Sequence, residues 1–226
     1  MSDDDRSNDV PAFVTPRFHA ALAYASMIHD GQVRKGVGKD SGRKGNGIPY
    51  IAHLLGVCAN ALNNDGTETE AIAALLHDAA EDQGGKPQLQ RIRELFGDDV
   101  ARIVDACSDS LVDTAKGDVK APWTQRKRTY LEHLEAENDA SILLVSACDK
   151  LDNLRAIVRD YKAIRDELWE RFNKDAGKQG SLWYYERLVA IFAKKAETQA
   201  NLVQIAAEME TLFATLPQRD PAWEPA

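Results

Sequence analysis

The sequence contains little cysteine and no long apolar run. Its three cysteines, Cys58, Cys107 and Cys148, are widely separated and flanked by small or apolar residues. An odd and scattered set of thiols argues against a disulfide framework or a zinc finger and favours buried thiols in a reducing cytosol. The longest apolar run, Ile142 to Cys148, is far shorter than the roughly 18 residues of a membrane-spanning helix. We therefore expect a cytoplasmic protein with no membrane segment.

The sequence also lacks an excess of positive charge. Its formal net charge of −8 argues against a general nucleic-acid binder, which needs a basic surface to neutralise phosphates. A small polyphosphate remains possible as a ligand, because it needs only a local basic patch. Residues 1–12 are rich in Asp and Ser and have no apolar stretch, so they predict a disordered acidic leader and not a signal peptide.

Strand-like alternation is hard to find along the chain, and helical periodicity dominates it. We therefore predict an all-α fold with one domain over residues 13–216. Its core spans about 17–160, a helical extension spans about 161–216, and the Pro-rich residues 217–226 form a flexible tail. The last helix, predicted over 182–216, carries an apolar stripe. That stripe could cover the domain's own core or pair with a second subunit, so oligomerisation through this helix stays open.

Two further segments carry local signals. Thr67 and Glu70 have the spacing of a capping box, which predicts the start of a helix. Residues 36–47 form a Gly- and Lys-rich loop that cannot pack in a core. Its basic side chains could reach substrate phosphates, although a solvated loop is the favoured interpretation.

A group of ionisable residues stands at the end of an apolar helix. His77 and Asp78 follow the run Ala73 to Leu76, and Glu81 and Asp82 come one turn later. A solvated acidic helix end is the alternative, but carboxylates there oppose the helix dipole. A bound cation would remove that conflict, so this group is a candidate metal site.

Asp149 directly follows the apolar run that ends at Cys148, so its carboxylate needs a partner in a largely buried helix. From this segment alone, a metal and a neighbouring cation such as Lys150 are equally good partners. Asn153 lies one turn further on and could hydrogen-bond a substrate, whereas Asp152 is expected on an exposed flank. His29 and His53, each considered alone, fit packed or surface histidines better than metal ligands.

Four blocks together resemble the hydrolase domain of RelA/SpoT homologues, and especially the small single-domain alarmone hydrolases. In family order they are His29–Lys35, Pro49–His53, Ala74–Asp82 and Asp149–Leu154. The resemblance covers roughly residues 18–185. It implies an HD-domain helical bundle, here with a C-terminal helical extension.

The resemblance also implies roles for particular residues. The metal ligands would be His29, His77, Asp78 and Asp149, holding one divalent metal that in this family is typically Mn²⁺; Zn²⁺ or Fe²⁺ would also suit such ligands. Glu81 and Asp82 match the catalytic acidic pair. The substrate-binding residues would be Arg34, Lys35, Asn153 and, as a residue of the site wall, His53.

By this resemblance, the activity is removal of the 3′-pyrophosphate from (p)ppGpp, which leaves GDP or GTP. One alternative is an HD phosphohydrolase for another nucleotide, such as (p)ppApp, NADPH or a nucleoside phosphate. Another is a nucleotide-binding regulator without catalysis, which Glu81 and Asp82 argue against. The sequence leaves open the preference for guanine over adenine and a role as antitoxin to an alarmone synthetase.

Overall fold

The computed structural model describes residues 14–34, 47–112, 117–172 and 176–225. Helices dominate these ranges, and the one β contact described is an isolated bridge between Val33 and Pro49. The predicted all-α fold is therefore confirmed. The leader over residues 1–12, and the basic loop apart from Gly47, lie outside the described residues.

In chain order the elements are α1 (Pro16–Ile28), α2 (Ile51–Asn63), α3 (Glu68–Leu76), α4 (Ala79–Asp82), α5 (Lys86–Phe96), α6 (Asp98–Cys107), α7 (Trp123–Ala136), α8 (Ala140–Ile164), the 3-10 helix η2 (Arg165–Arg171), α9 (Gly177–Ala196), the 3-10 helix η3 (Ala200–Leu202) and α10 (Val203–Phe213). Across the described ranges, no helix combines the length and the hydrophobicity that crossing a membrane requires.

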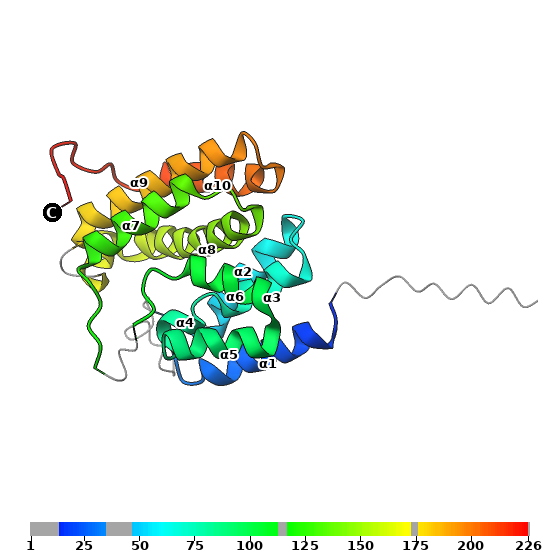
Figure 1. The fold of residues 1–226 in the computed structure, drawn as a ribbon. Helices are drawn as coiled ribbons and strands as arrows, with labels where there is room; N and C mark the ends of the chain where they lie inside the picture. The colour runs from blue at the N-terminus through cyan, green and yellow to red at the C-terminus, as the bar shows by residue number, and fades with distance from the viewer. Residues whose placement is uncertain (1–13, 35–46, 113–116, 173–175, 226) are drawn as a thin grey trace, which may run out of the picture.

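Helix α8 is the central element of the fold. Every residue from Ile142 to Asp149 is buried, as expected of a helix that is covered on all sides. Figure 1 shows α8 between α7, α9 and α10 on one side and α2, α3 and α6 on the other. Asp149 thus lies in the middle of the molecule, where its carboxylate must face other polar groups.

A tight turn joins α2 to α3 and fixes where α3 ends. A Cβ at Gly66 would lie 2.6 Å from the carbonyl oxygen of Ala61, so only glycine fits this turn. The Thr67 hydroxyl accepts a hydrogen bond from the Glu70 backbone N–H, and the Glu70 carboxylate accepts one from the Thr67 N–H. The predicted capping box is confirmed. The helix that it starts is buried from Glu70 onward and ends directly before His77.

The C-terminal region contains two helices where the sequence predicted one over residues 182–216. Helix α9 ends at Ala196, and Gln199 has an extended backbone (φ −125°, ψ 104°) before η3 and α10 begin. A straight helix of the predicted length would run about 50 Å and carry its distal apolar residues away from the core. The break lets α10 pack on α8 and α9 and bury Leu202 and Ile205. The apolar stripe therefore covers the chain's own core.

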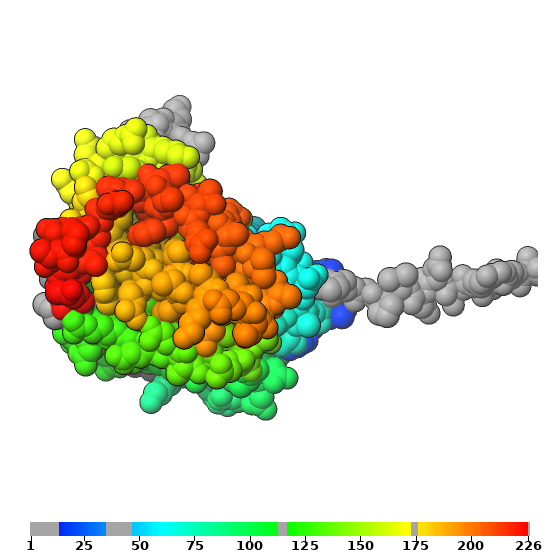
Figure 2. Space-filling model, turned by 90° about the horizontal axis from the view of Figure 1, so that it is seen from above, coloured from blue at the N-terminus to red at the C-terminus, as the bar shows by residue number. Residues whose placement is uncertain are grey.

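The last described residues pack on α9, whereas the sequence predicted a flexible tail. Arg219 forms an ion pair with Glu186 of α9 and donates a hydrogen bond to the carbonyl oxygen of Trp223. The Trp223 ring lies 6.4 Å from the ring of Trp183, also in α9. Figure 2 shows the tail beside α9 on the face formed by the C-terminal helices. The aromatic contact and the ion pair offset the entropy lost on ordering this segment.

Candidate functional site

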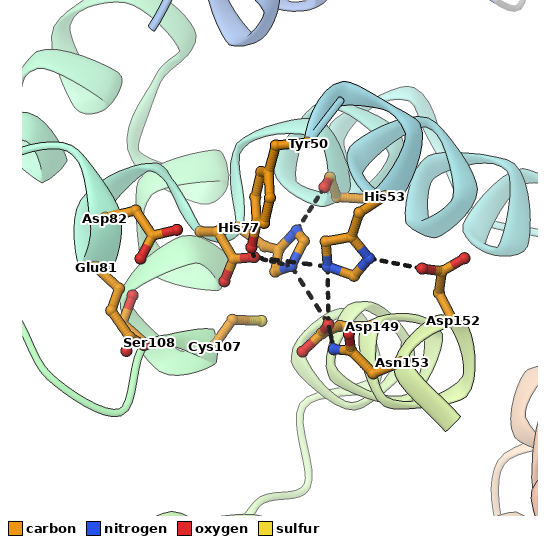
Figure 3. A network of polar contacts seen from close by, with 12 residues as sticks. Tyr50, His53, His77, Glu81, Asp82, Cys107, Ser108, Asp149, Asp152 and Asn153 are labelled. Carbon is orange, nitrogen blue, oxygen red and sulfur yellow. Dashed lines mark hydrogen bonds and ion pairs between the residues drawn. The ribbon is translucent and has the colours of Figure 1, made fainter. Parts of the chain in front are cut away.

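Three buried side chains from distant parts of the sequence meet beside α8. His53 comes from the first turn of α2, His77 follows α3, and Asp149 belongs to α8 (Figure 3). One possible ligand atom of each lies within 4.8 Å of those of the other two. The Oδ1 atom of Asp149 is 3.2 Å from Nε2 of His53 and 3.5 Å from Nε2 of His77. This cluster is a candidate site for a divalent metal.

Asp78 adds a second carboxylate to the cluster. Its Oδ2 atom is 3.0 Å from Nε2 of His77 and 3.5 Å from Nε2 of His53, and it accepts a hydrogen bond from the hydroxyl of Tyr50. The helical backbone is interrupted here, because α3 ends before His77 and α4 begins after Asp78. The turn between these helices lets His77 and Asp78, which are neighbours in sequence, face the same centre.

The donor set fits a cation. Nδ1 of His77 lies 2.8 Å from the carbonyl oxygen of Ala74 and therefore carries the proton, while its buried Nε2 has no hydrogen-bond partner. That nitrogen lone pair faces the centre, as in a ligand to a metal. Burial disfavours the charged form of His53, but its contacts with Asp149, Asp152 and Asp78 prevail and raise its pKa to about 9. A bound cation would balance the same carboxylates.

His29, predicted as a metal ligand, lies outside this group, although its Nε2 is also buried without a hydrogen-bond partner, and we propose His53 in its place. Its Nδ1 atom lies 2.7 Å from Oε1 of Gln32, and its ring stacks on Tyr50 at 5.2 Å between centroids. The same Tyr50 ring is 5.5 Å from the ring of His53. The structure therefore brings together His53, His77, Asp78 and Asp149.

A signal for His53 was present in the sequence. His53 shares a helix face with Leu54, Val57 and Ala61, all of which are buried. Helical spacing thus puts the imidazole in the core, where it needs a polar partner. The sequence could not reveal that two of its partners, Asp149 and Asp152, lie on α8.

The two acidic residues of α4 lie beside the cluster. Glu81 accepts hydrogen bonds from Nζ of Lys120, at 2.8 Å, and from the backbone N–H of Asp109, at 3.3 Å. Asp82 accepts one from the side chain of Gln32 at 2.8 Å. Burial, and then the nearby charge of Asp109 for Glu81 and of Asp78 for Asp82, raises the pKa of both carboxyl groups. A raised pKa makes a carboxyl group better suited to exchange protons near neutral pH.

The cluster opens into a cavity of about 420 Å³ with distinct chemical regions. We call His53, His77, Asp78 and Asp149 the metal-type cluster. Three of its members, His53, Asp78 and Asp149, line one part of the cavity together with the α4 carboxylates. Cationic side chains, Arg34, Lys127 and Lys150, line the walls. Its aromatic lining consists of Tyr50, Trp123, Tyr130, Phe172, Tyr184 and Tyr185. Such a cavity can hold a ligand that has both a flat ring and negative charge.

Three of the four predicted substrate-binding residues line this cavity, namely Arg34, His53 and Asn153. The guanidinium of Arg34 donates a hydrogen bond to Oδ1 of Asn153 at 2.9 Å, and the amide of Asn153 donates to Asp149 at 2.6 Å. Lys35 lies outside the described residues. His53, the predicted wall residue, also belongs to the metal-type cluster.

Sequence reasoning missed the polar residues on the far side of Glu81. Asp109, with a side chain only 4% exposed, accepts hydrogen bonds from Arg126 and Lys127 at 2.6 Å each. Burial opposes its ionisation, but the two cations prevail and hold its pKa well below the usual range. No local pattern marks Asp109 in the sequence, because its ion pairs depend on the position of α7.

Comparisons with known proteins agree with this geometry. A probable GTP pyrophosphokinase of Mycobacterium leprae is 33% identical over 138 residues, covering 61% of this chain and 15% of that protein. A guanosine-3′,5′-bis(diphosphate) 3′-pyrophosphohydrolase of Aquifex aeolicus is 30% identical over 137 residues, covering 61% and 17%. The chain therefore spans about a sixth of the length of these relatives.

A solved structure has a similar fold over most of both chains. It is described as a metazoan orthologue of SpoT that hydrolyses ppGpp. It superimposes with a TM-score of 0.65 at 23% identity and covers 89% of this chain and 96% of its own. The family model for the HD domain matches residues 21–181, a span that holds the whole metal-type cluster. Since this match covers most of the sequence, the chain belongs to the HD domain family.

Proposed function

We propose that this protein is a metal-dependent phosphohydrolase that removes the 3′-pyrophosphate of (p)ppGpp and leaves GDP or GTP. The observation that carries the proposal is the position of the two α4 carboxylates beside a cluster of two imidazoles and two carboxylates, inside one cavity with cationic walls. The named activities of the Aquifex and metazoan relatives support the choice of substrate.

His53, His77, Asp78 and Asp149 would hold the metal, and we propose Mn²⁺, which accepts imidazole and carboxylate ligands. When bound, such a cation lowers the pKa of a water molecule and polarises a phosphoryl oxygen. Glu81 or Asp82 would then take a proton from the attacking water, because both carboxyl groups lie near the cluster and have raised pKa values. General acid–base catalysis of this kind typically contributes about 10²–10⁴-fold to the rate.

The cationic and aromatic parts of the cavity would bind the nucleotide. Arg34, which is hydrogen-bonded to Asn153, and Asn153, which is hydrogen-bonded to Asp149, would contact the nucleoside, and Lys35 is proposed to assist them. Lys127 and Lys150 put positive charge on the cavity wall, where it would stabilise the departing pyrophosphate. We place the activity in the cytoplasm, consistent with the three buried, free cysteines.

The test is pyrophosphate release from ppGpp by metal-stripped protein, with and without added Mn²⁺. We expect release only with Mn²⁺, and loss of release in Asp78→Ala at an unchanged circular dichroism spectrum. Full activity of Asp78→Ala would contradict the metal assignment. Metal-dependent hydrolysis of (p)ppApp, NADPH or a nucleoside phosphate, but not of ppGpp, would contradict the substrate assignment while keeping the phosphohydrolase.

A further inference from the structure

Asp152 lies within the site, although the sequence placed it on an exposed flank. Its side chain is only 16% exposed. Oδ2 of Asp152 lies 2.7 Å from Nδ1 of His53 and accepts a hydrogen bond from Arg34 at 2.5 Å. One carboxylate oxygen therefore joins a metal-type ligand to a residue proposed to bind the nucleotide.

The contact with Asp152 determines which nitrogen of His53 is free. A carboxylate can only accept a hydrogen bond, so Nδ1 of His53 carries the proton. In the neutral imidazole that a metal would bind, the lone pair is then on Nε2, which faces Asp149 at 3.2 Å and Asp78 at 3.5 Å. A carboxylate behind a histidine ligand fixes its tautomer and ring orientation and makes it a stronger ligand.

Arg34 also reaches the cluster by a second route. Its other terminal nitrogen donates to Asn153, whose amide donates to Oδ1 of Asp149. The planar guanidinium thus contacts two adjacent residues of α8, and each of these contacts a metal-type ligand, His53 or Asp149.

The packing of α2 on α8 leaves space for this carboxylate. A Cβ placed on Gly56 would lie 2.4 Å from Oδ1 of Asp152. Any other residue at this position would displace the carboxylate or separate the two helices. Glycine within a helix costs about 0.5–1 kcal/mol relative to alanine, and at Gly56 its small size lets Asp152 reach His53.

We propose that Asp152 is a positioning residue that couples metal binding to nucleotide binding, by holding His53 and Arg34 on one carboxylate oxygen. The inference rests on the proposed function in taking the cluster to bind a divalent metal and the cavity to bind a guanine nucleotide. Coupling is reciprocal, so Mn²⁺ strengthens nucleotide binding by the same factor as the nucleotide strengthens Mn²⁺ binding.

The experiment is a pair of calorimetric titrations on the metal-stripped full chain. Mn²⁺ is titrated alone, and GDP is titrated with and without Mn²⁺. In the wild type we expect GDP to bind about 5–150-fold more tightly with Mn²⁺. Asp152→Asn should weaken Mn²⁺ binding by about 10–100-fold and bring the ratio of the two GDP affinities close to one.

Gly56→Ala tests the same carboxylate without altering it. We expect this variant to weaken Mn²⁺ binding in the same direction, because its methyl group displaces Asp152. The matched control is Glu208→Gln in α10. It removes the ion pair between Glu208 and Arg155, which lies on α8 like Asp152 but away from the cavity. This control should keep the Mn²⁺ affinity and the ratio of the GDP affinities with and without Mn²⁺. A melting curve for each variant shows that the chain is folded.

The outcomes separate this inference from the proposed function. Unchanged Mn²⁺ affinity in Asp152→Asn overturns the role of Asp152. So does weakened Mn²⁺ affinity, if Mn²⁺ still strengthens GDP binding by the same factor as in the wild type. If the wild type binds Mn²⁺ but no GDP, the proposed substrate class and the coupling to it both fail. In that case the Mn²⁺ titrations of Asp152→Asn and Gly56→Ala still decide whether the carboxylate positions His53.

Discussion

His29 and His53 are both buried, yet their surroundings give them different chemistry. His53 faces the carboxylates of Asp78 and Asp149 through one nitrogen and Asp152 through the other. His29 contacts the neutral side chain of Gln32 and the ring of Tyr50. The three carboxylates around His53 concentrate the negative charge that attracts a metal cation.

We therefore expect His53→Ala and His29→Ala to differ in metal binding. His53→Ala removes a nitrogen from the centre of the cluster and should abolish stoichiometric Mn²⁺ binding to the metal-stripped protein. His29→Ala should retain one bound Mn²⁺ per chain. Both are measured by equilibrium dialysis with elemental analysis, and loss of Mn²⁺ in His29→Ala alone would restore the original assignment.

Asp109 makes a prediction about stability and pH. Its pKa is lowered in the folded protein, so its ion pairs stabilise the fold above the unfolded pKa, about 3.9. That stability is lost as the pH falls through the lower folded value. Asp109→Asn should cost about 3 kcal/mol at pH 7, because Arg126 and Lys127 lose their partner.

Urea unfolding of Asp109→Asn and wild type from pH 7 to pH 2 checks this expectation. The deficit should persist to about pH 4 and shrink only in stronger acid. The control is Asp166→Asn, whose exposed carboxylate pairs with Lys178 and whose loss should change stability little. A pH-independent deficit in Asp109→Asn would contradict an electrostatic origin.

The limits of sequence reasoning at this scale are physical. Adjacent residues and helix spacing place His77, Asp78 and Asp149 at the ends or on the faces of apolar helices. The structure brings these three together. The contacts of Asp152 and Asp109 join helices that are far apart in sequence, and no local pattern encodes which helix packs against which.

Local signals at the scale of single elements identify where helices begin better than where they end. The Thr67 capping box is contained within four residues and forms as predicted. Helix α8, by contrast, runs on to Ile164, past the limit predicted near residue 160 between the core and the helical extension. The break between α9 and α10 has neither glycine nor proline at residues 197–202. It follows from the gain in burial when α10 folds back, which is a property of the whole core.

Thr67→Ala tests how much the cap contributes. Removing the hydroxyl leaves the backbone N–H of Glu70 without its acceptor, and we expect a loss of about 1 kcal/mol in the free energy of unfolding. Urea denaturation measures it, with the exposed Thr211→Ala in α10 as control. Because α3 is held in place by its buried face, Mn²⁺ affinity should stay the same. A large fall in Mn²⁺ affinity would show that the cap also positions His77.

At the scale of the whole molecule, aromatic residues connect the tail to the cavity. Trp223 contacts Trp183 of α9, and Trp183 lies 6.5 Å from Trp123, which lines the cavity and begins α7. A Cβ on Gly180 would lie within 3.6 Å of both Trp123 and Trp223. The tail therefore supports one wall of the cavity from behind.

We expect Trp223→Ala to lower the melting temperature by a few degrees, since an aromatic pair contributes about 0.5–1.5 kcal/mol beyond the area it buries. The affinity for GDP should fall, while Mn²⁺ affinity should not change. The control is Glu224→Ala, which alters an exposed side chain of the same tail. If Trp223→Ala leaves both the melting temperature and GDP binding unchanged, the tail does not support the wall.

The HD-domain match ends at residue 181, but the cavity does not. Tyr184 and Tyr185 follow that boundary, and Trp123 is held in place by two tryptophans beyond it. The C-terminal segment therefore completes a cavity whose candidate metal cluster and cationic side chains lie within the matched span. Exchanging the residues after 181 between relatives would alter the aromatic wall of the cavity while His53, His77, Asp78 and Asp149 stay in place.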